Sequence, residues 1–284
     1  MDEGEKGRGI LSWVRGLFTR RDYIFCVIIM KKSVFLQTEQ TRKHMQAFVL
    51  AAGLGTRLKP LTNNKPKALV EVNGQPLLKI TIDKLIKQKV TRIVVNVHHF
   101  ADDICHYLDS LKWDAEILIS DERQQLLDTG GGLKHAASLF GKNEPILIHN
   151  VDILSHIDFG EALAYHSYSK NIATLFVSNR KTTRYLLFDN NRQLIGWEDI
   201  KSGEKKWSNH PTSEYTPLAF SGISIIQPEL TDLLPEEVHP YPIIPAYLEI
   251  AKTHRIRDFI HNSNDWLDVG KPETLAQAQQ WILS

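Results

Sequence analysis

The run QAFVLAAGLGTRLKPLTNNKPK, residues 46–67, joins a short apolar segment to a long loop that contains glycines and basic residues. The segment 46–51 is almost continuously apolar, which is typical of a strand buried on both faces of a sheet. Gly53 and Gly55 follow it directly. A buried strand that runs into a glycine-containing loop predicts the start of a parallel α/β sheet, in which ligands bind at the carboxyl ends of the strands.

More apolar runs follow this segment, at residues 93–97, 115–119, 145–149 and 172–177. They alternate with stretches that have the periodicity of amphipathic helices, at residues 77–87, 101–111, 132–140 and 159–169. This alternation predicts parallel strands that are joined by right-handed helical crossovers. We therefore expect an α/β fold with a doubly wound, mostly parallel, Rossmann-like sheet.

The pattern changes after Arg180. Residues 185–188, 193–197 and 218–226 are typical of antiparallel strands, and the polar stretch 199–213 lies between the last two. We expect a small inserted antiparallel sheet or lid, in an insertion around residues 184–226. Helical segments at 243–253 and 272–282 then return the chain to the first sheet, so residues 45–284 are predicted to form a single domain.

Residues 1–44 differ from the rest of the chain in their excess of lysine and arginine. The apolar run at 23–30 follows two arginines, but two lysines come directly after it and no small-residue cleavage site follows, which argues against a secretory signal. We expect a leader of uncertain order and a catalytic chain that effectively begins at Met45. A weak membrane-surface role for Trp13, Phe18 and the arginines is an open alternative.

The composition is that of a soluble globular protein, with 42% hydrophobic and 24% charged residues. Its 34 basic and 33 acidic residues nearly cancel, so we expect no nucleic-acid partner. No apolar run approaches the roughly 20 residues of a transmembrane helix, so we expect no integral membrane segment. Two cysteines, Cys26 and Cys105, are too few for a disulfide framework and suit a reducing compartment, which favours the cytoplasm.

The loop after the first strand is the first candidate for a functional site. Gly53 and Gly55 allow the backbone to approach a polyphosphate and to turn several N–H groups toward it. Arg57 and Lys67 add positive charge to the same loop. Glycine pairs also occur in ordinary turns with solvated basic residues, so this pair alone is not specific for phosphate.

The complete string is far more specific. Gly53-x-Gly-Thr-Arg57, followed by Pro60-x-Thr62 and Pro66-Lys67, resembles the signature loop of the sugar-1-phosphate nucleotidyltransferases. It contains neither a Walker loop nor the Rossmann fingerprint. The resemblance implies a nucleotide-diphospho-sugar transferase fold and two substrates, a nucleoside triphosphate and a sugar 1-phosphate. It places the nucleotide against residues of this loop, namely Ala51, Ala52, Gly53, Gly55, Thr56, Arg57 and Lys67.

Later motifs extend the resemblance to the C-terminus. The segment 127–132, LDTGGG, is similar to the family's contact with the nucleobase and ribose, which implies roles for Thr129, Gly130 and Gly131. Segment 220–224, FSGIS, is similar to the strand on which the sugar lies. The resemblance places the sugar against Asn150, Glu198 and Gly222. An ordinary helix N-terminus at Thr129 and a plain bulge at Gly222 are the structural alternatives.

Two aspartates stand where the family binds its metal. Asp152 ends the segment IHNVD, although the family usually has a small residue where this chain has Val151. Asp268 lies in the segment DWLDVG before the last helix. The resemblance implies that both bind Mg²⁺, which prefers a few carboxylates together with phosphate oxygens and water. A single aspartate at either place would more often be a helix cap or a salt-bridge partner.

The reaction implied by the resemblance is attack of a sugar-1-phosphate oxygen on the α-phosphorus of the nucleotide, which expels pyrophosphate. Such a reaction needs positioning and positive charge more than a covalent nucleophile. Arg57 is expected to hold the leaving β- and γ-phosphates, and Lys67 the oxygens near the α-phosphorus. No general base is needed, because a sugar phosphate is already ionised at neutral pH.

The choice of sugar and base is less determined. The compact catalytic part, the triple glycine at 130–132 and the segment FSGISIIQP resemble the members of this family that act on N-acetylmuramate 1-phosphate, which implies UTP and that sugar phosphate as substrates. The alternatives are mannose- or heptose-1-phosphate guanylyl transfer, a phosphocholine cytidylyltransferase-like reaction, and a non-catalytic role as a nucleotide-sugar sensor. Many family members have a Glu-Lys pair on the inserted sheet, whereas this chain offers Glu198 and then Lys201. Its histidines lack metal-ligand spacing and are expected to be structural.

Overall fold

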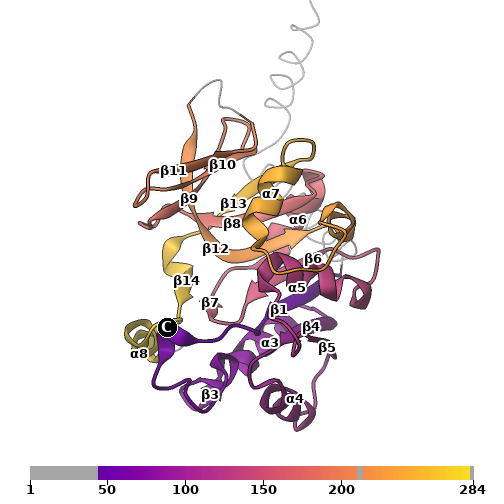
Figure 1. Ribbon diagram of the computed structural model, residues 1–284, viewed down its shortest axis with the longest axis vertical. Coiled ribbons are helices and arrows are strands. Elements are labelled where there is room, and N and C mark those ends of the chain that lie inside the picture. Colours follow the sequence, from indigo (N-terminus) through magenta and orange to yellow (C-terminus); the bar gives the residue numbers. More distant parts are fainter. Residues whose placement is uncertain (1–43, 210–213, 282–284) are drawn as a thin grey trace, which may run out of the picture. The chain divides into compact units, whose positions relative to one another are not determined.

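The strand β1 (Gln46–Leu50) lies in the middle of a ten-stranded sheet in the computed structural model, which describes residues 44–209 and 214–281 (Figure 1). The expected leader at 1–44 lies outside the described residues except for His44. The side chains of β1 are buried on both faces, as the apolar run predicts.

A parallel core surrounds β1. Strand β4 (Arg92–Val97) and strand β6 (Ile146–Asn150) flank it, and β5 (Glu116–Asp121) lies beyond β4, all parallel. Helices α3 (Leu77–Lys87), α4 (Ala101–Asp109) and α5 (Asp128–Ala136) lie in the connections between these strands. The prediction of an α/β fold with a doubly wound parallel core is confirmed, and α3 has the bounds that the periodicity indicates.

The other half of the sheet is mostly antiparallel. The long strand β12 (Thr216–Ile226) pairs antiparallel with β6 at one end and with β8 (Ala173–Ser178) on its other side. Strand β13 (Ile256–Ile260) then pairs parallel with β8. Helices α6 (Phe159–Tyr168) and α7 (Ile243–Ile250) precede β8 and β13 respectively, so the chain does return to the first sheet.

The predicted antiparallel strands form an extension of the same sheet. Strands β9 (Arg184–Phe188), β10 (Leu194–Asp199) and β11 (Glu204–Trp207) pair antiparallel in succession, and β9 joins the first residues of β12. These strands are called the small sheet below, and they lie at the top left of Figure 1. The extension therefore continues the main sheet through β12.

Two short two-stranded sheets complete the architecture. Strand β14 (Trp266–Asp268) pairs antiparallel with β7 (Ile153–Ser155), which begins directly after the carboxyl end of β6. Strands β2 (Glu71–Val72) and β3 (Gln75–Pro76) form a second pair before α3. Helix α8 (Pro272–Trp281) follows β14, so the last segment of the chain reaches the carboxyl edge of the parallel core.

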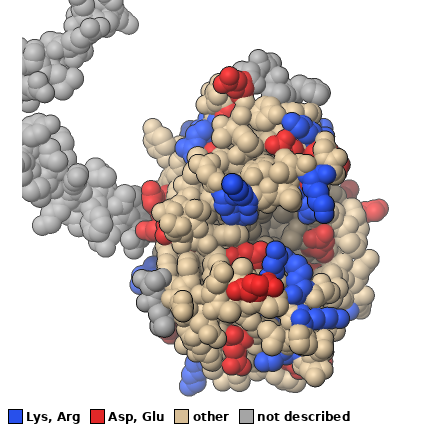
Figure 2. Space-filling model, turned by 90° about the vertical axis from the view of Figure 1, so that its left-hand side faces the viewer, with Lys and Arg blue, Asp and Glu red and all other residues tan. Residues whose placement is uncertain are grey.

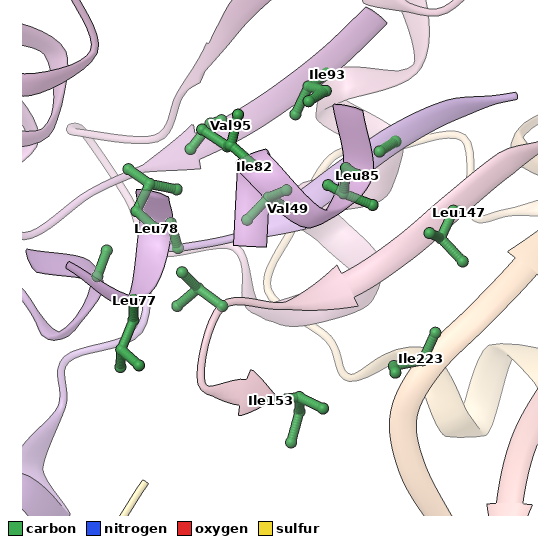
Figure 3. Close-up of a cluster of buried hydrophobic side chains, with 14 of the residues drawn as sticks. Val49, Leu77, Leu78, Ile82, Leu85, Ile93, Val95, Leu147, Ile153 and Ile223 are labelled. Atoms are coloured by element: carbon green, nitrogen blue, oxygen red, sulfur yellow. The ribbon is translucent and has the colours of Figure 1, made fainter. Parts of the chain in front are cut away.

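Two hydrophobic clusters cover the two faces of the sheet. On β1 the side chains alternate, because Ala47 and Val49 belong to one cluster and Phe48 belongs to the other. Figure 3 shows the first cluster, in which Ile82 and Leu85 of α3 lie against strand residues such as Val49. Burial of both faces explains why the strands of the core read as continuous apolar runs.

Within residues 44–209 and 214–281, no helix combines the length and the apolar character that a membrane crossing requires. Cys105 is a free, half-buried cysteine on α4.

Truncation of the core should be costly. Ile82 is a fully buried residue on the face of α3 that packs against the sheet. Ile82→Ala should therefore lower the free energy of unfolding by about 2–5 kcal/mol. Ile200 is 59% exposed, and Ile200→Ala should change that energy by less than about 0.5 kcal/mol. Urea or thermal unfolding of both variants measures the difference. Equal losses from the two variants would contradict the assigned core.

Candidate active site

A cleft of about 600 Å³ lies at the carboxyl ends of the parallel strands. The loop after β1 contributes residues 52–57, and Asn96, Asn150 and Asp152 follow or end the neighbouring strands. Figure 2 shows the face that carries β14 and α8, where basic and acidic side chains gather around a hollow. This edge of the sheet is the one at which an open α/β fold binds its ligands.

Four charged side chains converge in this cleft. Lys67, at the start of a short 3₁₀ turn, donates through Nζ to Oδ2 of Asp152. Nη2 of Arg57 lies 3.9 Å from Oδ2 of Asp152, and its Nη1 lies 4.0 Å from Oδ2 of Asp268. The structure therefore brings together all the residues that were predicted to bind the metal or act on the phosphates, although they come from three separate segments.

Gly270 lies at the point where these side chains meet. A Cβ atom there would lie 2.8 Å from Oδ1 of Asp268 and 2.9 Å from both Oδ2 of Asp152 and Nη2 of Arg57. The Gly270 N–H donates to Oδ1 of Asp268 at 2.7 Å, and the preceding N–H, of Val269, donates to the Asp152 carbonyl at 2.9 Å. Any side chain at position 270 would push the two carboxylates and the guanidinium apart.

The donor set fits a magnesium ion. Two carboxylates face one point, and within the described ranges no group of three or more His, Cys, Asp and Glu side chains gathers to hold a metal. A pair of aspartates leaves most coordination positions to phosphate oxygens and water, which is the arrangement that Mg²⁺ favours. Zinc, which takes three or four nitrogen and sulfur ligands, would lack them here.

The four charges differ in burial. The side chains of Lys67 and Asp152 are only 13% and 10% exposed, whereas those of Arg57 and Asp268 are 56% and 36% exposed. The inner Lys67–Asp152 pair therefore acts in a medium of lower dielectric constant, where a fixed charge has a stronger effect on a bound ligand. The outer Arg57 side chain is more exposed to solvent, and its contact with phosphates stays a prediction.

A buried polar pair holds the loop after β1 in place. Oδ1 of Asn96 accepts hydrogen bonds from the N–H groups of Ala51 and Ala52 at 2.7 and 3.2 Å. Nδ2 of Asn96 donates to Oε1 of Glu122 at 2.8 Å, and Oε2 of Glu122 accepts from the Leu127 N–H at 3.1 Å. Burial raises the pKa of the Glu122 carboxyl. Neither residue was predicted, although a lone asparagine in the apolar strand 93–97 was a usable signal.

The glycines of the loop have different roles. Gly55 has a φ of 64°, and a Cβ there would lie 3.0 Å from Lys67 Cβ and from Thr62 Cγ2. Oγ1 of Thr62 donates to the Gly55 carbonyl at 2.8 Å, so the loop folds back on itself. Gly53 has open space at its Cβ position and lines the cleft, as does Thr56. Their contact with a nucleotide stays a prediction.

The triple glycine lies inside α5, which begins at Asp128, four residues earlier than the periodicity indicated. The N–H groups of Gly130 and Gly131 donate to the Tyr241 carbonyl at 2.9 and 3.3 Å. A Cβ on Gly130 would collide with the Tyr241 ring, and one on Gly131 with the His239 carbonyl. The glycines therefore permit close packing against the segment before α7, and their contact with a nucleobase stays a prediction. Thr129 does line the cleft.

Of the three residues that were predicted to contact the sugar, Asn150 and Gly222 lie together, whereas Glu198 lies elsewhere. Gly222 has a φ of 71°, and its Cβ position lies 2.7 Å from Nδ2 of Asn150, which lines the cleft. Glu198 lies on the small sheet and is not among the cleft-lining residues. It pairs at 3.0 Å with Nζ of Lys205, the residue opposite it on β11. Lys205 was not predicted, because the pairing of two strands is not visible in one sequence.

Two ionisable groups lie buried behind Asp152. His149, on β6, contacts the Asn150 carbonyl through Nδ1 at 2.8 Å, and burial followed by the charge of Lys84 lowers its pKa to about 3. Lys84, on α3, donates to the carbonyl and hydroxyl of Ser155, and its burial lowers its pKa to about 7. Their contacts with backbone and core indicate a structural role for both side chains.

The lowered pKa of His149 makes the fold sensitive to acid. Between pH 6.5 and about 3, His149 is neutral in the folded protein but protonated in the unfolded chain. The free energy of unfolding that the neutral His149 contributes above pH 6.5 is therefore lost as the pH falls through this range. Lys84 is already charged below about pH 7 and adds little slope there. His149→Gln should lose less stability on acidification, by up to about 1.4 kcal/mol per pH unit. Urea titrations from pH 7 to 4 test this, and parallel curves would contradict it.

Comparison with known proteins agrees with this geometry. The sequence matches the nucleotidyl transferase family over residues 46–284. It is 34% identical over 240 residues to an N-acetylmuramate alpha-1-phosphate uridylyltransferase of Caulobacter vibrioides, covering 82% of this chain and 95% of the relative. It is 26% identical over 239 residues to the mannose-1-phosphate guanylyltransferase catalytic subunit beta of Dictyostelium discoideum, covering 81% of this chain and 62% of the relative.

The fold is similar to that of solved structures. The crystal structure of HddC from Yersinia pseudotuberculosis complexed with GMP-PN superposes with a TM-score of 0.65 at 19% identity, covering 84% of this chain and 99% of that one. A putative glucose-1-phosphate thymidylyltransferase from Bacillus anthracis superposes with a TM-score of 0.66 at 18% identity, covering 83% of this chain and 94% of that one.

Proposed function

The chain belongs to the nucleotidyl transferase family, and on that basis we propose that it joins UTP to N-acetylmuramate 1-phosphate with release of pyrophosphate. As a member of this family it is a sugar-1-phosphate nucleotidyltransferase. The choice of UTP and of the muramate sugar is the proposal. Muramate is a cell-wall sugar, so the reaction proposed is a step of cell-wall recycling in the cytoplasm.

Two comparisons support this choice of substrates. The relatives that are described as N-acetylmuramate alpha-1-phosphate uridylyltransferases are 34% and 30% identical, and the alignments cover 95% and 97% of their length. The mannose-1-phosphate guanylyltransferase of Dictyostelium discoideum is 26% identical and is covered only to 62%. The alignments thus cover nearly the whole of the two muramate relatives but only part of the mannose relative.

The convergence of Arg57, Lys67, Asp152 and Asp268 carries the proposed mechanism. In this reaction an oxygen of the sugar phosphate forms a bond to the α-phosphorus, and the bond from that phosphorus to the bridging oxygen breaks as pyrophosphate leaves. Lys67 is fixed by its pairing with Asp152, so its charge is already oriented before the α-phosphate becomes more negative. The exposed Arg57 reaches the β- and γ-phosphates and neutralises the leaving group.

Asp152 and Asp268 would hold Mg²⁺, which supplies charge neutralisation for the phosphates when it is bound. In the structure Lys67 pairs with Asp152, and Arg57 lies near both Asp152 and Asp268, so the two basic side chains partly neutralise these carboxylates. Gly53 leaves open space at its Cβ position, Gly55 permits the left-handed turn that packs the loop against Lys67 and Thr62, and Asn96 fixes the backbone before them. No residue is needed as general base, since the attacking phosphate is already ionised.

The substrate choice is tested with purified protein in a pyrophosphate-release assay containing Mg²⁺. UTP, GTP, CTP, ATP and dTTP are each combined with the 1-phosphates of N-acetylmuramate, mannose, glucose, N-acetylglucosamine and heptose, and with phosphocholine. The proposal predicts the highest kcat/KM for UTP with N-acetylmuramate 1-phosphate. Preference for GTP with mannose or heptose 1-phosphate would contradict the substrates, and no release at all would contradict the mechanism.

The role of Lys67 gives a sharper prediction. Lys67→Ala removes a fixed charge beside the α-phosphate, so kcat should fall by about 100- to 1,000-fold, and Asp268→Asn should cause a comparable loss. Lys79→Ala is the matched control, because Lys79 pairs with Asp83 on the surface of α3, and its kcat should stay within twofold. Thermal unfolding midpoints check that the variants are folded. A Lys67→Ala protein with near-normal turnover would exclude the assigned role.

A further inference from the structure

Arg180 is a basic side chain that no part of the proposed mechanism uses. It follows β8, and its guanidinium lies 4.4 Å from the centre of the Trp266 ring, in a cation–π contact. Its Nη2 donates to the Phe220 carbonyl on β12 at 2.6 Å. The Trp266 indole in turn donates to the Ser221 carbonyl at 2.8 Å. The guanidinium is therefore fixed between β12 and β14, directly beside the segment that carries Gly222.

Arg180 is not among the residues that line the cleft, but it lies beside the part of β12 that carries Gly222, the predicted sugar contact. Trp266 and Asp268 are two residues apart on β14 and so project from the same face of that strand. Gly222, two residues after the carbonyl that Arg180 binds, lies against Asn150 at the wall of the cleft. Arg57 and Lys67, which serve the reacting phosphates, come from the loop after β1 instead.

The charge of Arg180 is poorly compensated by the protein. Burial lowers the pKa of its guanidinium, and the charge of Asp268 opposes that shift. Among the residues that the structure describes, no carboxylate forms an ion pair with it, and its buried Nε has no hydrogen-bond partner. A half-buried cation without an anionic partner raises the free energy of the folded protein. This penalty increases when the charge of Asp268 is shared with a metal ion. An anionic group on the ligand would supply the missing partner charge for the Arg180 guanidinium.

We propose that Arg180 binds the carboxylate of an acidic acceptor sugar and thereby selects it over neutral sugar 1-phosphates. This inference rests on the proposed function, since N-acetylmuramate carries a lactyl carboxylate in addition to its 1-phosphate. A planar guanidinium stacked on an indole presents its N–H groups at its edge, which matches the geometry of a carboxylate. Nη2 is held by Phe220, so Nη1 is the donor that meets the ligand.

The experiment compares N-acetylmuramate 1-phosphate with its neutral carboxamide as acceptors, in the wild-type protein and in Arg180→Gln. Loss of a charge-assisted hydrogen bond should lower the wild-type kcat/KM for the carboxamide by about 10- to 100-fold. In Arg180→Gln the ratio of the two kcat/KM values should approach one, and in Arg180→Lys it should lie between. Arg184→Gln is the matched control, since Arg184 is an exposed neighbour paired with Asp199, and it should retain the wild-type ratio.

Each outcome decides the inference. Equal wild-type kcat/KM values for acid and carboxamide would overturn it, and this comparison needs no variant to fold. If Arg180→Gln lowered kcat/KM equally for the acid and the carboxamide, so that their ratio stayed at the wild-type value, the inference would also be overturned. The Arg180 side chain would then act on the phosphate or on Asp268. Failure of the proposed function has a different signature: the wild-type protein would not use N-acetylmuramate 1-phosphate at all, and the inference would fall with it.

Discussion

Two carboxylates that face one point repel each other, and the structure of the site follows from how this repulsion is balanced. Asp152 and Asp268 approach because Gly270 leaves room for them and because the Val269 N–H binds the Asp152 carbonyl. Lys67 neutralises the pair from the buried side and Arg57 from the exposed side. The topology brings these residues together, since β1 and β6 end at the same edge of the main sheet, and β14, paired with β7 in a separate two-stranded sheet, places Asp268 opposite Ile153.

Much of this arrangement could be predicted from the sequence because its signals are local. The apolar runs and helical periods locate the parallel core, and the residues of the loop 53–67 indicate phosphate chemistry by themselves. The periodicity placed the start of α5 four residues late, because the glycines at 130–132 contribute no apolar side chains to the pattern. They are tolerated because the Tyr241 carbonyl, over a hundred residues away, accepts their N–H groups. The Asn96–Glu122 pair was missed for the same reason, since only tertiary contact reveals a satisfied polar pair.

The sugar side was the least predictable part because it depends on strand pairing. The sequence shows Glu198 and then Lys201, which departs from the Glu-Lys pair of many family members, whereas in the structure Glu198 pairs with Lys205 across the β10–β11 pairing. Arg180 gave no signal at all in the sequence. Its position depends on β12 and β14, which supply a carbonyl and an indole from distant segments. The predicted phosphate contacts thus come from one loop, whereas the proposed sugar contacts come from several strands.

The central claim is that an empty position at Gly270 allows the two carboxylates and Arg57 to meet. Its most direct test is Mg²⁺-dependent turnover by Gly270→Ala beside Gly141→Ala, a glycine whose added Cβ would make only ordinary contacts of 3.5 Å. We expect Gly270→Ala to lose at least about tenfold in kcat and to need more Mg²⁺ for half-maximal rate, while Gly141→Ala keeps both values and both proteins stay folded. Unchanged kcat and Mg²⁺ dependence in folded Gly270→Ala would contradict the claim.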